Sequence, residues 1–220
     1  MISVIIPCYN EAENLPNLVA QLGGSRSCMQ IIVVDGGSTD NTVALAKENS
    51  DEVIVSGKGR AAQMNSGAAL ALGDVLWFLH ADTGFNEPID HYIGLLEGAV
   101  WGFFGVRLSS DKWYFRIIGK MISLRSRLQC IGTGDQGLFV RRELFEQISG
   151  FESIPLMEDI ALCKRLRKMT VPTVASFALI TSSRRWQQYG VIKTVLLMWS
   201  LRFLYFVGVS PEKLAKRYYS

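Results

Sequence analysis

Apolar and polar positions follow two alternating patterns through the first 82 residues. Short runs of β-branched and large apolar residues predict buried strands at residues 2–6, 30–34, 52–55 and 75–79. The segments between them carry apolar residues at helical spacing and predict helices at residues 13–22, 41–49 and 61–72. Strands and helices that alternate in this way form βαβ units, because parallel neighbours need a crossover connection. The pattern therefore predicts an α/β fold with a mostly parallel sheet.

Beyond residue 84 the alternation loosens, but elements can still be assigned. Strands are predicted at residues 101–108 and 136–140, and helices at residues 88–97, 113–128, 142–148 and 157–169. Neither an internal repeat nor a low-complexity linker interrupts the chain. We therefore expect one main domain.

The stretch from residue 190 to 209 is strongly apolar. A membrane-spanning helix needs about 20 mostly apolar residues, but Lys193 and Arg202 lie inside this one. A charge at the centre of a spanning helix costs roughly 2.5–3.5 kcal/mol. Two alternatives stay open: a helix that packs on the domain or on a partner, and a helix that lies on a cytoplasmic membrane face with the basic residues that follow it.

Composition narrows the class of protein. With 220 residues, 49% hydrophobic and 20% charged, the chain is long and apolar enough for a folded core. The net charge of +3 is too small to predict nucleic-acid binding. Four cysteines without a C-x-x-C pair indicate reduced thiols in the cytoplasm. No basic segment precedes the first apolar run, so we expect no signal peptide.

Acidic side chains follow three of the predicted strands. Glu11 follows the first strand, Asp35 the second and Asp82 the fourth. The carboxyl ends of such strands lie at one edge of the sheet, where ligands bind. Glu11 and Asp35 offer hydrogen-bond acceptors to a nucleoside, and Asp82 offers an oxygen ligand for a divalent cation. Taken singly, each of these residues is more typical of an ordinary turn, and it is their occurrence at three strand ends that favours a site.

Three further clusters carry candidate chemistry. Arg60 follows a lysine and a glycine at a helix start, where an anion such as phosphate binds well, although a solvated loop fits equally. Glu158 and Asp159 lie at the start of a helix. A carboxylate there can act as a general base, or the two acids can stabilise the helix through its dipole. Arg184 and Arg185 precede Trp186, a combination that suits a diphosphate or a lipid headgroup layer.

Taken together, these motifs resemble family 2 glycosyltransferases of the GT-A fold. Residues 3–11, with Pro7, Tyr9 and Glu11, are similar to the opening strand of that family, and residues 33–40 to its second strand. His80-Ala81-Asp82 stands where the family has its D-x-D motif, with His80 in place of the first acid. Gly36 likewise replaces a usual second aspartate. Residues 150–151 and 157–159 are similar to a glycine-phenylalanine and a glutamate-aspartate signature.

The resemblance implies a Rossmann-like sheet flanked by helices and a metal-dependent, inverting sugar transfer. It implies a GT-A domain at residues 1–185, with a donor half at 1–85 and an acceptor half at 86–185, followed by a helical segment at 186–220. The catalytic pair would be Asp159, as base, and Glu158, and the ligands of Mn²⁺ or Mg²⁺ would be Asp82 and His80. Contacts to the donor would come from Pro7, Tyr9, Glu11, Asp35, Arg60, Asn65, His80, Ala81, Asp82, Asp135, Arg184, Arg185 and Trp186.

The expected partners are a UDP- or GDP-linked sugar and a hydroxyl acceptor, for which a lipid-linked glycan precursor is one candidate. A peripheral contact of residues 190–217 with the inner face of the cell membrane, and a homodimer, are both compatible with this interpretation.

Two rival functions remain at this stage. A nucleotidyltransferase normally has a glycine-rich loop after its first strand, and residues 7–11 do not supply one. A catalytically idle nucleotide-binding scaffold or membrane-surface interaction protein would account for Gly36 and His80, the two departures from the family pattern.

Overall fold

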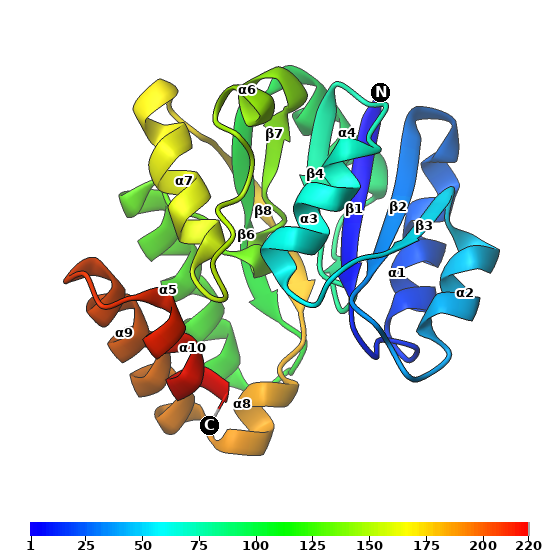
Figure 1. Ribbon diagram of the computed structural model, residues 1–220. Coiled ribbons are helices and arrows are strands. Elements are labelled where there is room, and N and C mark those ends of the chain that lie inside the picture. The colour runs from blue at the N-terminus through cyan, green and yellow to red at the C-terminus, as the bar shows by residue number, and fades with distance from the viewer. Residues whose placement is uncertain (220) are drawn as a thin grey trace.

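The computed structural model describes residues 1–219 and has one sheet of eight strands, in the order β3-β2-β1-β4-β7-β6-β8-β5. Helices cover both faces of this sheet (Figure 1). The strands are β1 (Ile2–Cys8), β2 (Met29–Asp35), β3 (Glu52–Val55), β4 (Val75–Phe78), β5 (Gly84–Phe85), β6 (Trp101–Leu108), β7 (Phe139–Arg141) and β8 (Thr173–Thr181). The predicted α/β class is confirmed.

The first four strands form the predicted parallel half of the sheet. β1 pairs in parallel with β2 and β4, and β2 pairs in parallel with β3. The helices that connect them are α1 (Leu15–Leu22), α2 (Thr42–Asn49) and α3 (Arg60–Ala69). Cys8 lies opposite Asp35 in the register, and Ile5 lies opposite Phe78. The carboxyl ends of β1, β2 and β4 therefore meet at one edge, as the sequence predicts.

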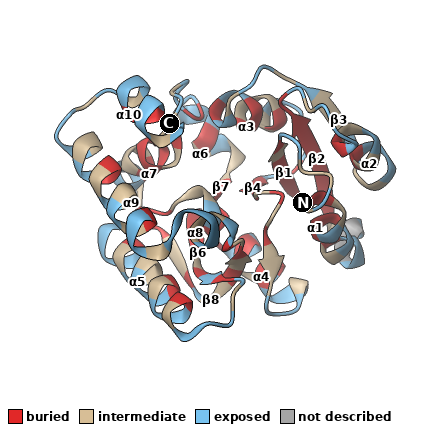
Figure 2. Cartoon of the chain, turned by 90° about the horizontal axis from the view of Figure 1, so that it is seen from below, coloured by how far each residue is buried: buried red, intermediate tan, exposed pale blue. Residues whose placement is uncertain are grey.

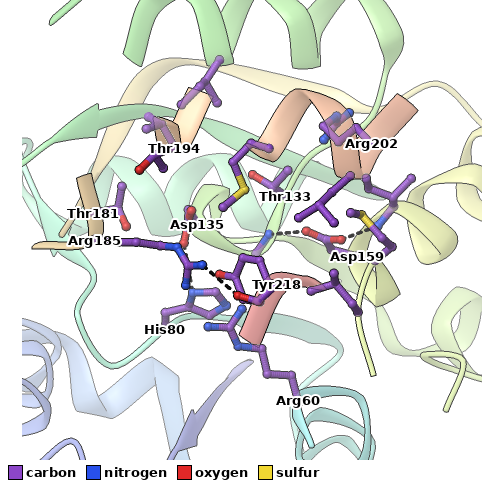
Figure 3. A pocket seen from close by; sticks show the side chains of 18 of the residues that line it. Arg60, His80, Thr133, Asp135, Asp159, Thr181, Arg185, Thr194, Arg202 and Tyr218 are labelled. Atoms are coloured by element: carbon purple, nitrogen blue, oxygen red, sulfur yellow. Dashed lines mark hydrogen bonds and ion pairs between the residues drawn. The ribbon is translucent and has the colours of Figure 1, made fainter. Parts of the chain in front are cut away.

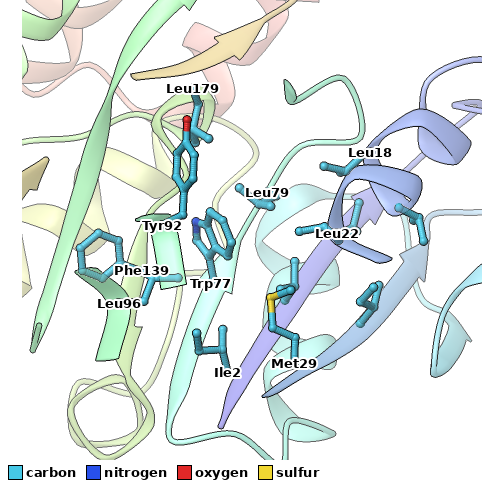
Figure 4. Close-up of a cluster of buried hydrophobic side chains, with 14 of the residues drawn as sticks. Ile2, Leu18, Leu22, Met29, Trp77, Leu79, Tyr92, Leu96, Phe139 and Leu179 are labelled. Carbon is cyan, nitrogen blue, oxygen red and sulfur yellow. The ribbon is translucent and has the colours of Figure 1, made fainter. Parts of the chain in front are cut away.

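Alternate residues of the strands point into two separate cores. Ile2, Val4 and Ile6 of β1 face one core, while Ile5 faces the other. The first core includes Trp77, which is fully buried and whose ring centroid lies 5.7 Å from that of Phe104 (Figure 4). Because both faces of the strands are buried, β1, β2 and β4 read as continuous apolar runs.

The second half of the sheet is mixed. β7 is antiparallel to β4 and β6, β6 is parallel to β8, and β5 is antiparallel to β8. The sequence pattern predicts no element at residues 173–181, where the structure has β8. The helices in this half of the chain are α4 (Ile89–Gly98), α5 (Trp113–Gln129), α6 (Arg142–Gln147) and α7 (Glu158–Met169). Two short 3-10 helices lie at Gly23–Cys28 and Gly134–Gln136.

After the short α8 (Arg184–Tyr189), the apolar stretch forms one helix, and the basic segment that follows it forms another. α9 (Val191–Phe206) ends before Gly208, which has a φ of +90°, and α10 (Pro211–Tyr219) follows. Leu201 of α9 and Leu214 of α10 are buried in the second core, so both helices pack on the domain. The view in Figure 2 also shows many exposed residues on α5 and α9. Within residues 1–219 the structure has no helix of the length and apolar content that a membrane span requires.

Candidate active site

A pocket of about 950 Å³ opens at the carboxyl ends of β1 and β4 and extends between α5, α7 and α9. Most of the residues predicted for the site line it. They are Pro7, Tyr9, Glu11, Arg60, His80, Ala81, Asp82, Asp135, Glu158, Asp159, Arg185 and Trp186. The close-up in Figure 3 shows side chains from both halves of the chain turned toward this space. The structure thus brings residues of the N-terminal and C-terminal halves of the chain together around one cavity.

Asp35, Asn65 and Arg184 do not line this pocket. Asp35 is only 1% exposed, and its carboxylate accepts hydrogen bonds from the N–H groups of Gly37 and Ser38, both at 2.8 Å. Arg184 is exposed, and its Nη2 lies 3.9 Å from Glu11 Oε2. The predicted contact of Asp35 with a nucleobase stays a prediction. In this structure the Asp35 carboxylate closes the turn after β2.

The glycine at position 36 has a local physical explanation. The side-chain amide of Gln63 on α3 donates to the carbonyl oxygens of Cys8 and Val34, each at 2.8 Å. A Cβ at Gly36 would lie 3.1 Å from Gln63 Nε2, so a larger side chain would press on the amide that joins the ends of β1 and β2. Gly36 therefore suits the contacts of Gln63 in this chain.

Asn65 connects α3 to the segment before α7. Its Nδ2 donates to the Phe151 carbonyl, and its Oδ1 accepts from the Phe151 N–H, both at 2.9 Å. Phe151 is buried, and its ring centroid lies 4.9 Å from that of Phe78 on β4. Asn65 thus holds the Gly150–Phe151 turn against the central sheet.

We expect Asn65→Ala to destabilise the fold, because two backbone groups of Phe151 lose their partners. Each buried group left unsatisfied costs about 1–3 kcal/mol, so thermal unfolding should show a lower melting temperature. Asn65→Asp keeps the acceptor for the Phe151 N–H but places a carboxylate oxygen against the Phe151 carbonyl, so it should also lower the melting temperature. If Asn65→Ala instead weakened nucleotide-sugar binding without changing the melting temperature, Asn65 would be a donor contact and not a structural bridge.

His80 and Asp82 follow the end of β4. His80 Nδ1 lies 3.2 Å from Asp135 Oδ1, and Gly134 lies against the imidazole, since a Cβ there would come within 2.5 Å of Nε2. Desolvation would raise the pKa of Asp135, but the hydrogen bond and charge of His80, together with the charge of Arg60, lower it below its ordinary value. Asp82 is half-exposed at the pocket wall and has no side-chain partner within residues 1–219.

The side chains at this edge that could bind a metal fit a cation that is also bound by a ligand. Residues 1–219 contain no group of three or more His, Cys, Asp or Glu side chains placed to hold a metal by themselves. Mg²⁺ and ions like it are commonly bound by one or two carboxylates together with the phosphates of a substrate. The carboxylate of Asp82 fits that role, whereas His80 Nδ1 already contacts Asp135.

Glu158 and Asp159 open α7 after a sharp turn at Met157, whose φ is +70°. Asp159 Oδ2 accepts the Gly134 N–H at 2.9 Å, and Oδ1 accepts the Ile160 N–H at 2.7 Å, so the carboxylate is fixed at the pocket wall. Glu158 is 7% exposed. Desolvation, followed by the charge of Asp159, raises its pKa. The two acids therefore have different environments, with Asp159 the more accessible one.

Arginines on α3 and α8 face the same space. Desolvation would lower the pKa of Arg60, but the charges of Glu158 and Asp135 outweigh it and raise the pKa. Arg185 Nη2 donates to the Tyr218 carbonyl at 3.2 Å, and its guanidinium carbon lies 3.9 Å from the centre of the Tyr218 ring. Figure 3 shows Tyr218 beside His80, Arg60 and Arg185. Both cations are accessible from the pocket.

Many lining residues were not predicted as site residues, and Tyr218, Arg125 and Arg202 are the ones among them that bear on the chemistry of the pocket. Tyr218 lies on α10, far in sequence from the motifs, and only the packing of Leu214 one turn earlier indicates its direction. Arg125 and Arg202 are charged residues within apolar segments, and this position is the feature of the sequence that could have identified them as site residues. Their approach to one another depends on the packing of α5 and α9.

Comparison with known proteins agrees with this geometry. Residues 3–97 match the family described as Glycosyl transferase family 2. The poly-beta-1,6-N-acetyl-D-glucosamine synthase of Staphylococcus aureus is 31% identical over 147 residues, which cover 59% of this chain and 34% of the synthase. The undecaprenyl-phosphate 4-deoxy-4-formamido-L-arabinose transferase of Aeromonas hydrophila is 26% identical over 234 residues, covering 91% of this chain and 66% of that protein.

A similar fold occurs in a solved structure. The mannosyltransferase PcManGT of Pyrobaculum calidifontis, in complex with GDP-Man and Mn²⁺, superposes with a TM-score of 0.64 at 18% identity, over 82% of this chain and 56% of that one. The present chain thus spans only part of the length of these proteins. Residues 3–97 are thus similar to glycosyltransferase family 2, and the chain shares the GT-A fold of the mannosyltransferase.

Proposed function

We propose that this protein transfers a sugar from a nucleoside-diphosphate sugar to a hydroxyl acceptor with inversion at the anomeric carbon. One observation carries the proposal: Asp82, whose carboxylate has no partner within residues 1–219, and the fixed carboxylate of Asp159 face one pocket together with Arg60 and Arg185. A metal-binding acid, cations for a diphosphate and a base for a hydroxyl are the groups that such a transfer needs.

The proposed roles follow from the contacts. Arg60 and Arg185 compensate the charge of the leaving diphosphate, and His80, held by Asp135, orients the loop that carries Asp82. A divalent cation bound by Asp82, Mn²⁺ or Mg²⁺, supplies further positive charge there.

Asp159 takes the proton of the acceptor hydroxyl while the hydroxyl oxygen bonds to the anomeric carbon. The bond from that carbon to the diphosphate oxygen breaks on the opposite side. Attack from the face opposite the leaving group inverts the configuration.

The acceptor side of the pocket supports a lipid-linked acceptor. Residues of α5 and α9 give it an apolar wall, and two large apolar side chains of α9 that line the pocket are also exposed, Trp199 at 56% and Phe203 at 66%. We propose that α9 and α10 rest on a membrane surface and that the acceptor reaches the pocket from there. The name of the Aeromonas relative, which includes undecaprenyl phosphate, is in keeping with such an acceptor.

Donor binding provides the direct test. We expect UDP- or GDP-linked sugars to raise the melting temperature, with a larger rise when Mn²⁺ is present, because a ligand of the native state stabilises it by mass action. Mn²⁺ alone and the matching nucleoside monophosphates serve as controls. If none of the common UDP- and GDP-sugars changes the melting temperature with Mn²⁺, the proposal fails. A donor that binds but is neither transferred nor hydrolysed would favour a nucleotide-binding scaffold.

A further inference from the structure

Two arginines project into the acceptor side of the pocket without a carboxylate partner. Arg202 of α9 is only 9% exposed, and its Nη2 donates to Gln129 Oε1 at 3.1 Å. Arg125 of α5 is half-buried, and its Nη2 donates to Ser126 Oγ at 3.2 Å, while its buried Nε has no hydrogen-bond partner in the described part of the chain. Neither guanidinium forms an ion pair within residues 1–219.

Burial disfavours the charged form of both guanidiniums. Desolvation and then the charge of Arg202 lower the pKa of Arg125 to about 10, and desolvation also lowers the pKa of Arg202. The negative charge of Asp159 acts in the other direction and raises the pKa of both arginines. Its oxygens, however, accept backbone N–H groups of Gly134 and Ile160. Buried cations of like sign are costly without an anion between them.

The helices that carry this pair also bring apolar residues to the pocket. Ile122 on α5, and Val195, Met198 and Phe206 on α9, line the same pocket as the two arginines. A ligand that fills this space therefore needs an apolar body and an anionic group. A phosphate monoester carries a charge of about −1.5 to −2 at neutral pH, which matches two guanidiniums better than a single carboxylate does, and arginine binds phosphate through paired N–H donors.

We propose that Arg125 and Arg202 form an anion subsite that binds a phosphate group of the acceptor, beside the proposed base Asp159. This inference rests on the proposed function, since it specifies that the hydroxyl acceptor also carries a phosphate ester and an apolar chain. The phosphate can come from a lipid headgroup or from a soluble phosphate, and the two sources differ in whether the chain adds to binding.

Binding of hexyl phosphate, inorganic phosphate and hexanol can be compared through the melting temperature and the tryptophan fluorescence. We expect hexyl phosphate to bind, and hexanol at equal concentration to have little effect. At least tenfold tighter binding of hexyl phosphate than of inorganic phosphate indicates a lipid-type phosphate, and equal binding indicates a soluble one. If neither phosphate bound, the subsite would be refuted, even if sugar nucleotides still bound to the donor side.

Variants separate a ligand subsite from a structural role. Arg202→Met and Arg125→Met should each weaken hexyl phosphate binding about tenfold or more. Each should also leave the melting temperature of the free protein unchanged or raised, because a repelling charge is removed. Arg116→Met on the exposed face of α5 is the matched control. Arg60→Met tests whether the ligand has entered the diphosphate side instead. A lowered melting temperature with unchanged hexyl phosphate affinity in both Arg125→Met and Arg202→Met would overturn the proposal.

Discussion

Asp159→Asn is expected to reduce sugar transfer by roughly 10²–10⁴-fold, the usual contribution of a general base, while donor binding stays near that of the wild type. The asparagine keeps a carbonyl oxygen that can accept the Gly134 N–H, so the loop at residues 133–135 should hold its position. The amide cannot take a proton from the acceptor hydroxyl. Single-turnover transfer of a labelled sugar, measured beside donor affinity, distinguishes the two effects.

The neighbouring acid supplies the control for this experiment. Glu158 is buried and has a raised pKa, because of desolvation and the charge of Asp159, so it is poorly placed to exchange protons with a ligand. Glu158→Gln should therefore lose less activity than Asp159→Asn. If Asp159→Asn transferred sugar at the full rate, or if Glu158→Gln were the more damaging change, the base would have been assigned to the wrong residue.

The donor side of the site could be predicted from sequence because local signals determine it. Each of β1, β2 and β4 is a continuous apolar run followed by polar turn residues, and the parallel topology brings their ends together. Glu11 and Asp82 thus reached one pocket as expected. Asn65 shows the limit of this approach, because the motif indicates where it lies but not that its amide contacts Phe151, which is 86 positions away.

The acceptor side depended on contacts between distant segments. β8 pairs with β6 across a long separation, and its residues 173–181 lack a clean alternation of apolar and polar positions, so propensity alone does not reveal it. Tyr218 reaches the pocket because α10 packs through Leu214 onto the second core. Similarly, Arg125 and Arg202 become a pair only when α5 and α9 lie on either side of one cavity.

The contacts around Gly36 and His80 bear on the rival interpretation of an idle scaffold. Gly36 suits the amide of Gln63, which ties two strands together. His80 has a partner in Asp135 and lies beside Asp82. Each departure from the family pattern thus has a physical role in this chain. The acid that remains in that motif, Asp82, therefore provides the decisive experiment.

Asp82→Ala is expected to abolish turnover and to remove the Mn²⁺-dependent part of donor binding. A metal-held charge contributes several kcal/mol of transition-state stabilisation, which corresponds to a rate loss of roughly a thousandfold or more. The fold should be unaffected, since Asp82 has no side-chain partner within residues 1–219 whose loss would matter. The readouts are the transfer rate and the rise in melting temperature with donor, each measured with Mn²⁺ and with a chelator.

Asp111→Ala is the matched control, because the side chain of Asp111 is 93% exposed and lies outside the pocket. It should retain both activity and the effect of Mn²⁺. A full Mn²⁺-dependent rise in Asp82→Ala would mean that the cation is held elsewhere. Asp82 would then be a wall residue of the pocket, and the donor phosphates would depend on Arg60 and Arg185 for their compensating charge.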